Sequence, residues 1–184
     1  VNDFGDLQTA QQRNVGLSDN TRGISAGGGD PLQTAGIEFV TIASTGDGTN
    51  FGNLTQARAG AGACASPTRG LVAGGYMTSP SPGNHNIIDY ITIATLGNAT
   101  RFGESSKAGA NSPMGASSAI RGVFAGGQFD NPYPQTDIID YITIATEGNA
   151  TDFGDLLAAR SHGSGLSNST RGCFAGGSPG KTNL

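Results

Sequence analysis

The chain has 184 residues, which is long enough for one sizeable core or for several small cores stacked together. Charged residues make up only 13% of the sequence and the net charge is −4, so no basic surface is available to attract nucleic acid. No apolar run reaches the roughly 18 residues that a membrane-spanning helix requires, so membrane insertion is not expected either.

The sequence is organised as four copies of one unit, and a Phe-Gly pair marks each copy. The pairs begin at Phe4, Phe51, Phe102 and Phe153, with spacings of 47, 51 and 51 residues. We divide the single repeat domain, residues 1–184, into approximate repeats 4–50, 51–101, 102–152 and an incomplete 153–184. A period of this length predicts one small structural unit that is stacked several times.

A polar segment and then a short apolar run follow each Phe-Gly pair. The polar segment contains Arg13, Arg58 or Arg160 in three copies, whereas the third copy departs and carries Lys107. Next come Arg-Gly, two residues and Ala-Gly-Gly, at residues 22–28, 69–75, 121–127 and 171–177. The apolar run between the glycines predicts a buried strand. The Gly-Gly pair predicts a strand end where φ turns positive or backbones crowd together.

A connection of variable length follows the first three Gly-Gly pairs, at residues 29–36, 76–87 and 128–138. Its Pro, Asn, Ser and Gly content predicts surface loops, which tend to carry binding functions. Nonrepeating side chains that are aromatic or flexible are our candidates for exposed contacts with a partner: Tyr76, Met77, His85, Phe129, Tyr133 and the neighbouring Pro134. Packing within the loop is the alternative role.

The segment Asp-Tyr-Ile-Thr-Ile-Ala-Thr, at residues 89–95 and 140–146, predicts a third strand because it is rich in β-branched residues. A diverged copy lies at residues 38–44. Apolar residues at both parities, such as Tyr90 and Ile91, indicate that both faces of this strand are covered. The Gly97–Asn98 pair predicts a tight turn into a last strand around the next Phe-Gly.

Each unit therefore offers about four short antiparallel strands in about 50 residues, and the fold class is all-β. One four-stranded sheet cannot bury both of its faces alone, whereas sheets packed around an axis shield one another. The pattern predicts β-propeller blades in a partial ring or in a segment of a larger propeller. Fewer than four complete units leave open edges, so we expect a longer polypeptide or another chain to complete the ring.

The order of these features resembles the Kelch repeat. Kelch motifs usually place tryptophan near the last strand, whereas this chain has no Trp and has the Phe-Gly phenylalanines there. The repeats are similar to those of bacteriophage proteins, especially from phages of marine cyanobacteria, where such arrays belong to tail fibres and other virion structural proteins. The resemblance implies a noncatalytic structural or attachment module of the virion. Its partners would be other virion proteins, copies of itself or a host surface glycan.

The repeated charged residues predict structural roles. The acid before the aromatic residue recurs at Glu38, Asp89 and Asp140, and an arginine recurs at Arg22, Arg69, Arg121 and Arg171. Catalysis needs unlike groups at one place, so equivalent copies favour hydrogen bonds between repeats. We expect the acids to bind an arginine or turn N–H groups, and the arginines to bind carboxylates or loop carbonyls. A channel of acids or an anion-binding ring of arginines is the alternative.

The cysteines and histidines predict no metal site, no cofactor and no catalytic centre. Cys64 and Cys173 stand where other copies carry small apolar residues, so we expect two buried structural thiols. His85 and His162 lie in different repeat contexts and lack metal-ligand spacing. Two rival functions are a carbohydrate-active propeller enzyme of the sialidase or galactose-oxidase type, and an extracellular bacterial surface adhesin or filament subunit.

Overall fold

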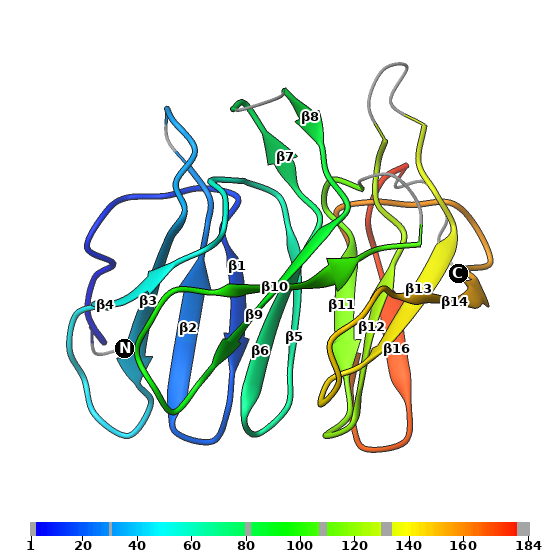
Figure 1. Ribbon diagram of the computed structural model, residues 1–184. Helices are drawn as coiled ribbons and strands as arrows, with labels where there is room; N and C mark the ends of the chain where they lie inside the picture. Colours follow the sequence, from blue (N-terminus) through cyan, green and yellow to red (C-terminus); the bar gives the residue numbers. More distant parts are fainter. Residues whose placement is uncertain (1–2, 30, 80–81, 107–109, 130–133, 180–184) are drawn as a thin grey trace.

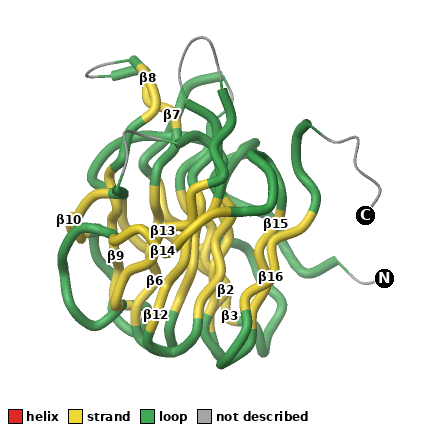
Figure 2. Tube along the Cα trace, turned by 90° about the vertical axis from the view of Figure 1, so that its right-hand side faces the viewer, coloured by secondary structure: helices red, strands yellow, loops and turns green. Residues whose placement is uncertain are grey.

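The computed structural model describes residues 3–29, 31–79, 82–106, 110–129 and 134–179. These residues form 16 strands and no helix, which confirms the predicted all-β class (Figure 2). Accordingly, this part of the chain contains no helix that is long and apolar enough to cross a membrane.

The described residues form three sheets of four antiparallel strands, which follow one another along the chain (Figure 1). Sheet 1 contains β1 (Val15–Ser18), β2 (Arg22–Ala26), β3 (Gly36–Thr41) and β4 (Thr49–Asn53). Sheet 2 contains β5 (Gly62–Ala65), β6 (Arg69–Ala73), β9 (Ile87–Thr92) and β10 (Thr100–Glu104). Sheet 3 contains β11 (Met114–Ser117), β12 (Arg121–Ala125), β13 (Ile138–Thr143) and β14 (Thr151–Asp155). Two hairpins complete the set, β7 (Tyr76–Met77) with β8 (Gly83–Asn84), and β15 (Ser164–Ser167) with β16 (Gly172–Ala175).

Each sheet is a meander in which consecutive strands pair, apart from the β7–β8 hairpin inserted within sheet 2. The pairing of the third and fourth strands shifts register next to the repeated acid in all three sheets. The Phe-Gly pair lies in the fourth strand of each sheet. The repeats defined by Phe-Gly therefore begin inside the last strand of a sheet, and each sheet extends over a repeat boundary.

Among the described residues, the hydrophobic core contains two apolar clusters, and each of them lies between neighbouring sheets. The first joins side chains of sheet 1, such as Phe51, to Ile91 and Ile93 of sheet 2. The second joins Ile88 of sheet 2 to Ile142 and other side chains of sheet 3. Since Ile88 and Ile91 both belong to β9, this strand is covered on both faces, as its sequence predicted. Burial of these faces is the main force that stacks the sheets.

The first strands of neighbouring sheets approach closely enough that one of them requires glycine. A Cβ atom at Gly115 of β11 would overlap the carbonyl oxygen of Ala63 in β5. Between the same strands, Ser117 Oγ accepts a hydrogen bond from the Ala65 N–H at 3.2 Å and donates one to the Ala65 carbonyl at 2.7 Å. Ser167 of β15 repeats this double contact with Ser117. A serine side chain thus joins two backbones that belong to different sheets.

The Gly-Gly pairs have positive φ in all four copies, as predicted; Gly74 and Gly75 have φ of +68° and +98°. A Cβ atom at Gly74 would also overlap the carbonyl oxygen of Ala110, which enters from the segment between sheets 2 and 3. Both reasons for glycine at this strand end therefore apply at once.

The predicted tight turn at Gly97–Asn98 is wrong. The turn lies earlier, where the Thr95 N–H donates to the Thr92 carbonyl at 3.2 Å. Gly97, with φ of +153°, and Asn98 instead pack against β4 of sheet 1. Asn98 Oδ1 accepts a hydrogen bond from the Asn53 N–H at 3.0 Å. The pair connects neighbouring sheets because glycine tolerates this φ and asparagine supplies an acceptor.

The two cysteines differ in exposure, and the prediction of a buried thiol is wrong for Cys173. Cys64 is 5% exposed, and its Sγ lies 2.7 Å from the position of a Cβ atom at Gly122 of sheet 3. Burial raises the pKa of the Cys64 thiol to about 12. Cys173 in β16 is the equivalent of Leu71 in β6, whose side chain packs against sheet 3. It is exposed because, in the described part of the chain, no further sheet follows β16.

Candidate functional site

The repeated acids connect each sheet to the segment that precedes it. Every acid accepts a backbone hydrogen bond from this segment: Glu38 from Gln8 at 2.9 Å, Asp89 from Thr55 at 3.0 Å and Asp140 from Ser106 at 2.9 Å. The predicted structural role of the acids between repeats is therefore confirmed.

Junction 1/2, where sheet 1 meets sheet 2, contains a buried ion pair. Arg58 Nη2 lies 2.5 Å from Asp89 Oδ2, and neither side chain is exposed. Arg58 Nη1 donates to the Ile87 carbonyl at 3.3 Å, and Thr55 Oγ1 donates to the Asp89 carboxylate at 2.8 Å. Burial lowers the pKa of the Arg58 guanidinium, and the facing charge of Asp89 opposes this shift. The hydrogen bonds replace the water that both charges lose on burial.

Junction 2/3, where sheet 2 meets sheet 3, has the same backbone contacts but a different side chain. The Ala110 carbonyl accepts a hydrogen bond from the Gly75 N–H at 3.0 Å. In the same way, the Arg58 carbonyl accepts one from the Gly28 N–H at 2.8 Å. Ala110 is therefore the structural equivalent of Arg58, and it supplies no guanidinium to the acid at this junction, Asp140.

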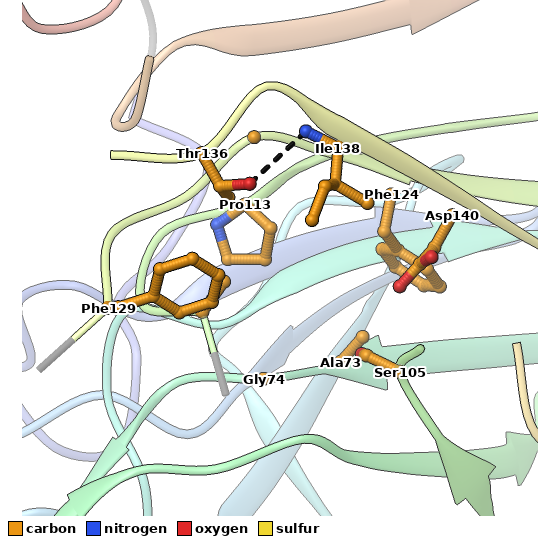
Figure 3. Close-up of a pocket in the computed structure, with 11 residues that line it drawn as sticks. Ala73, Gly74, Ser105, Pro113, Phe124, Phe129, Thr136, Ile138 and Asp140 are labelled. Atoms are coloured by element: carbon orange, nitrogen blue, oxygen red, sulfur yellow. Dashed lines mark hydrogen bonds between the residues drawn. The ribbon is translucent and has the colours of Figure 1, made fainter. Parts of the chain in front are cut away.

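A second side chain is also smaller at junction 2/3. The Ser105 N–H donates to the Asn86 carbonyl at 2.8 Å, as the Leu54 N–H donates to the Ala35 carbonyl at 2.7 Å. Serine thus replaces a leucine that is 5% exposed at junction 1/2. The two replacements accompany a cavity of about 30 Å³. Its walls include Ser105, Ala110, Pro113, Phe124, Phe129 and Asp140 (Figure 3).

The Asp140 carboxylate is 6% exposed, and its two oxygens differ in their contacts. Oδ2 accepts the Ser106 N–H, whereas buried Oδ1 has no hydrogen-bond donor among the described residues. A buried carboxylate oxygen without a donor is unfavourable because it has lost water and gained no partner. This oxygen is the feature that distinguishes the cavity from an ordinary packing defect.

The arginines at the start of the second strands bind the following sheet. Arg22 Nη1 donates to the Ile93 carbonyl at 2.5 Å, and Arg69 Nη1 donates to the Ile144 carbonyl at 3.0 Å. Each guanidinium also lies over an aromatic ring of its own sheet. The distance from Cζ to the ring centroid is 4.7 Å for Arg22 over Phe39, 4.6 Å for Arg69 over Tyr90 and 4.4 Å for Arg121 over Tyr141. The predicted contacts between arginines and carbonyls are confirmed for Arg22 and Arg69.

Two of the candidate loop residues, Tyr76 and Met77, are neighbours in β7. The Tyr76 N–H donates to the Ala59 carbonyl at 2.9 Å, and its side chain is half-buried. Met77 is fully buried, so the expected exposure is wrong for this side chain. Successive residues of a strand point to opposite faces, and Met77 lies on the covered one.

Of the other three candidates, His85 and Phe129 lie in two connections that contact each other, because Asn84 Nδ2 donates to the Gln128 carbonyl at 2.8 Å. His85 is half-buried, and its N–H donates to the Gly75 carbonyl at 3.1 Å. Phe129 lines the cavity at junction 2/3 (Figure 3), whereas Tyr133 lies outside the described residues. Within the residues that the structure describes, no group of three or more His, Cys, Asp or Glu could hold a metal ion.

Sequence reasoning did not identify Ala110 and Asp140 as parts of one site. Ala110 lies eight positions after Phe102 in the third copy, whereas Arg58 lies seven positions after Phe51. An alignment on Phe-Gly therefore places Gly109 opposite Arg58 and hides the replacement. The available signal was the absence of an arginine from this segment while the acid was retained.

No protein-family model matches the chain, and no curated protein matches it in sequence. The interpretation of the site therefore rests on its own residues.

Proposed function

We propose that the chain is a noncatalytic attachment module made of Kelch-like β-propeller blades. The blades form a scaffold, and the connections after the Gly-Gly pairs contact a partner. Three sheets with one meander topology, packed through two apolar clusters, support the propeller architecture. A partial ring, completed by further chain or by a second copy, fits this packing.

The difference between the sheets and their connections carries this proposal. The sheets repeat the same backbone contacts, their acids bind the segments that precede the sheets, and Arg22 and Arg69 bind the following sheet. By contrast, the connections between the second and third strands differ in length and sequence, and they lie at one end of the sheets (Figure 1). A constant scaffold with variable loops at one end is suited to recognition.

On the basis of the sequence resemblance to phage repeat proteins, we propose a virion as the location of this module and a host surface glycan or another virion protein as its partner. Half-buried Tyr76 on the β7–β8 hairpin offers an aromatic surface of the kind that contacts sugars and proteins.

A glycan array with the purified chain tests this proposal. We expect binding that is lost when residues 76–86 are replaced by the shorter connection 29–35, while the circular dichroism spectrum stays that of the parent chain; the melting temperature should fall, because buried Met77 is lost. Leu96→Ser is the matched control, because Leu96 is exposed and follows the turn at the opposite end of β9. Binding that survives replacement of every connection would contradict the proposal, and so would release of sugar products, which would support the enzyme alternative.

A further inference from the structure

We propose that the cavity at junction 2/3 is a binding site for the guanidinium group of a ligand. Asp140 supplies the carboxylate, and the place of the missing arginine side chain supplies the space. This inference rests on the geometry of the junction and is independent of the attachment role.

The protein itself shows which group fits such a space. At junction 1/2 the Arg58 guanidinium donates to Asp89 through Nη2 and to the Ile87 carbonyl through Nη1. Asp140 and Ile138 occupy the corresponding positions in β13. An incoming guanidinium would therefore meet the same two acceptors in the same relative positions.

Both acceptors at junction 2/3 have capacity for a donor. Asp140 Oδ1 has no donor within the described part of the chain, and the Ile138 carbonyl accepts one hydrogen bond, from the Gly126 N–H at 2.9 Å. The Ile87 carbonyl accepts the equivalent bond from Gly74 at 3.0 Å and still accepts Arg58. A carbonyl oxygen has two lone pairs, so Ile138 can accept a second donor in the same way.

The remaining walls suit a flat cation with an apolar stem. Phe124, Phe129 and Pro113 provide apolar surface in the walls of the cavity (Figure 3). A guanidinium is planar and more weakly hydrated than an ammonium group, and it can lie against aromatic rings. Ala110 and Phe129 are half-buried, which indicates that the cavity extends towards the surface. A ligand can therefore insert its head group while the rest of the molecule remains outside.

Titration with methylguanidinium chloride, followed by ¹H–¹⁵N NMR spectra, tests the site. We expect saturable shifts of the amide signals of Ser106, Ile138 and Asp140, and weaker binding of methylammonium. Asp140→Asn should reduce the affinity at least about tenfold, because it removes the buried charge. Asp137→Asn is the matched control, since it makes the same change of charge at an exposed residue and should leave the affinity unchanged.

Two further variants add an arginine side chain to junction 2/3 or remove it from junction 1/2. Ala110→Arg places a guanidinium of the chain in the cavity and should abolish binding of methylguanidinium. Arg58→Ala should create a second site, so that millimolar methylguanidinium raises its melting temperature more than that of the parent chain. If Arg58→Ala does not fold, Ala110→Arg and Asp140→Asn still decide the question.

The source of the guanidinium is decided by a Gly-Arg-Gly peptide with blocked termini. Binding of both probes would support an arginine side chain of a partner, and binding of methylguanidinium alone would support a small free ligand. The proposal is overturned if no saturable shift occurs, or if Asp140→Asn binds as tightly as the parent. It is also overturned if binding appears only in Lys107→Ala, because the chain would then fill the site with its own cation.

Discussion

At junction 1/2 Leu54 and Arg58 fill the space between the sheets, whereas at junction 2/3 Ser105 and Ala110 leave part of it open. The backbone hydrogen bonds at the two junctions are nevertheless equivalent. The main-chain contacts are therefore kept although Leu54 and Arg58 are replaced by smaller side chains and Val72 by the larger Phe124. The junctions can thus change their contents without a change of architecture.

The first strands show the opposite difference, because they pack more closely at junction 2/3 than at junction 1/2. Junction 1/2 has Ala63 and Ala65 in β5, whereas junction 2/3 has Gly115 and Ser117 at the equivalent positions of β11. Junction 2/3 is therefore closer and more strongly hydrogen-bonded at its first strands, although it is more open around Asp140. Four changes, from the largest expected effect to the smallest, test this contrast.

Arg58→Ala should have the largest effect, because it leaves the Asp89 charge buried without its cation. We expect the free energy of unfolding to fall by about 3–5 kcal/mol, measured by urea titration. Asp140→Asn at junction 2/3 is the matched control and should cost less than about 1 kcal/mol, since it leaves no charge unpaired. Equal losses in the two variants would show that the ion pair does not distinguish the junctions.

Gly115→Ala should be next in size, because its Cβ atom would overlap the Ala63 carbonyl oxygen. We expect a loss of about 1–3 kcal/mol in the free energy of unfolding from the displaced backbone. Gly16→Ala is the matched control: its Cβ atom would have no neighbour nearer than 3.9 Å, so stability should be unchanged or slightly higher. A neutral Gly115→Ala would mean that these strands can separate at little cost.

Ser117→Ala should cost about 1 kcal/mol, because it removes the side chain that bonds both the N–H and the carbonyl of Ala65. The change gives junction 2/3 the alanine that junction 1/2 has in this place. Ser18→Ala in β1 is the control, since the Ser18 hydroxyl makes no hydrogen bond within the described part of the chain. Thermal unfolding of both variants should separate the two effects, and equal melting temperatures would contradict the role of Ser117.

The two cysteines should differ in their reactivity towards a thiol reagent, and this test requires no change in the stability of the protein. Iodoacetamide at pH 8 should label exposed Cys173 and spare Cys64, because the thiolate is the reactive form and burial raises the pKa of Cys64 to about 12. Peptide mass spectrometry gives the extent of labelling at each site. Rapid modification of Cys64 in the folded protein would show that junction 2/3 opens readily.

The period of the sequence predicted the all-β class, the second to fourth strands of each sheet, and the structural contacts of the repeated acids and of Arg22 and Arg69. These features depend on local pattern and on equivalence between copies. The Gly97–Asn98 turn was wrong because turn chemistry alone does not reveal that a glycine packs against another sheet. The exposure of Cys173 could not be predicted either, because burial depends on which sheet follows.

The cavity was not predictable for a related reason. One additional residue before Ala110 moves it out of alignment with Arg58 when the copies are aligned on Phe-Gly. An alignment on the Arg-Gly motif pairs the two residues, and the hydrogen bond of the Gly75 N–H shows the same equivalence. The retained acid looked like any other copy. Its unpaired oxygen becomes visible only when the neighbouring segments are placed around it.

The strand that contains Phe-Gly is the last strand of one sheet, and the next strand along the chain is the first of the following sheet. The sequence repeat and the sheet therefore begin at different points of the chain. Phe51, Phe102 and Phe153 follow one another at spacings of 51 residues. Unequal recombination between such copies would remove or duplicate a whole period and rejoin the chain at matching points within one strand. Every strand would keep a hydrogen-bonded partner. The gene could therefore change the number of sheets in a single event without leaving an unpaired strand.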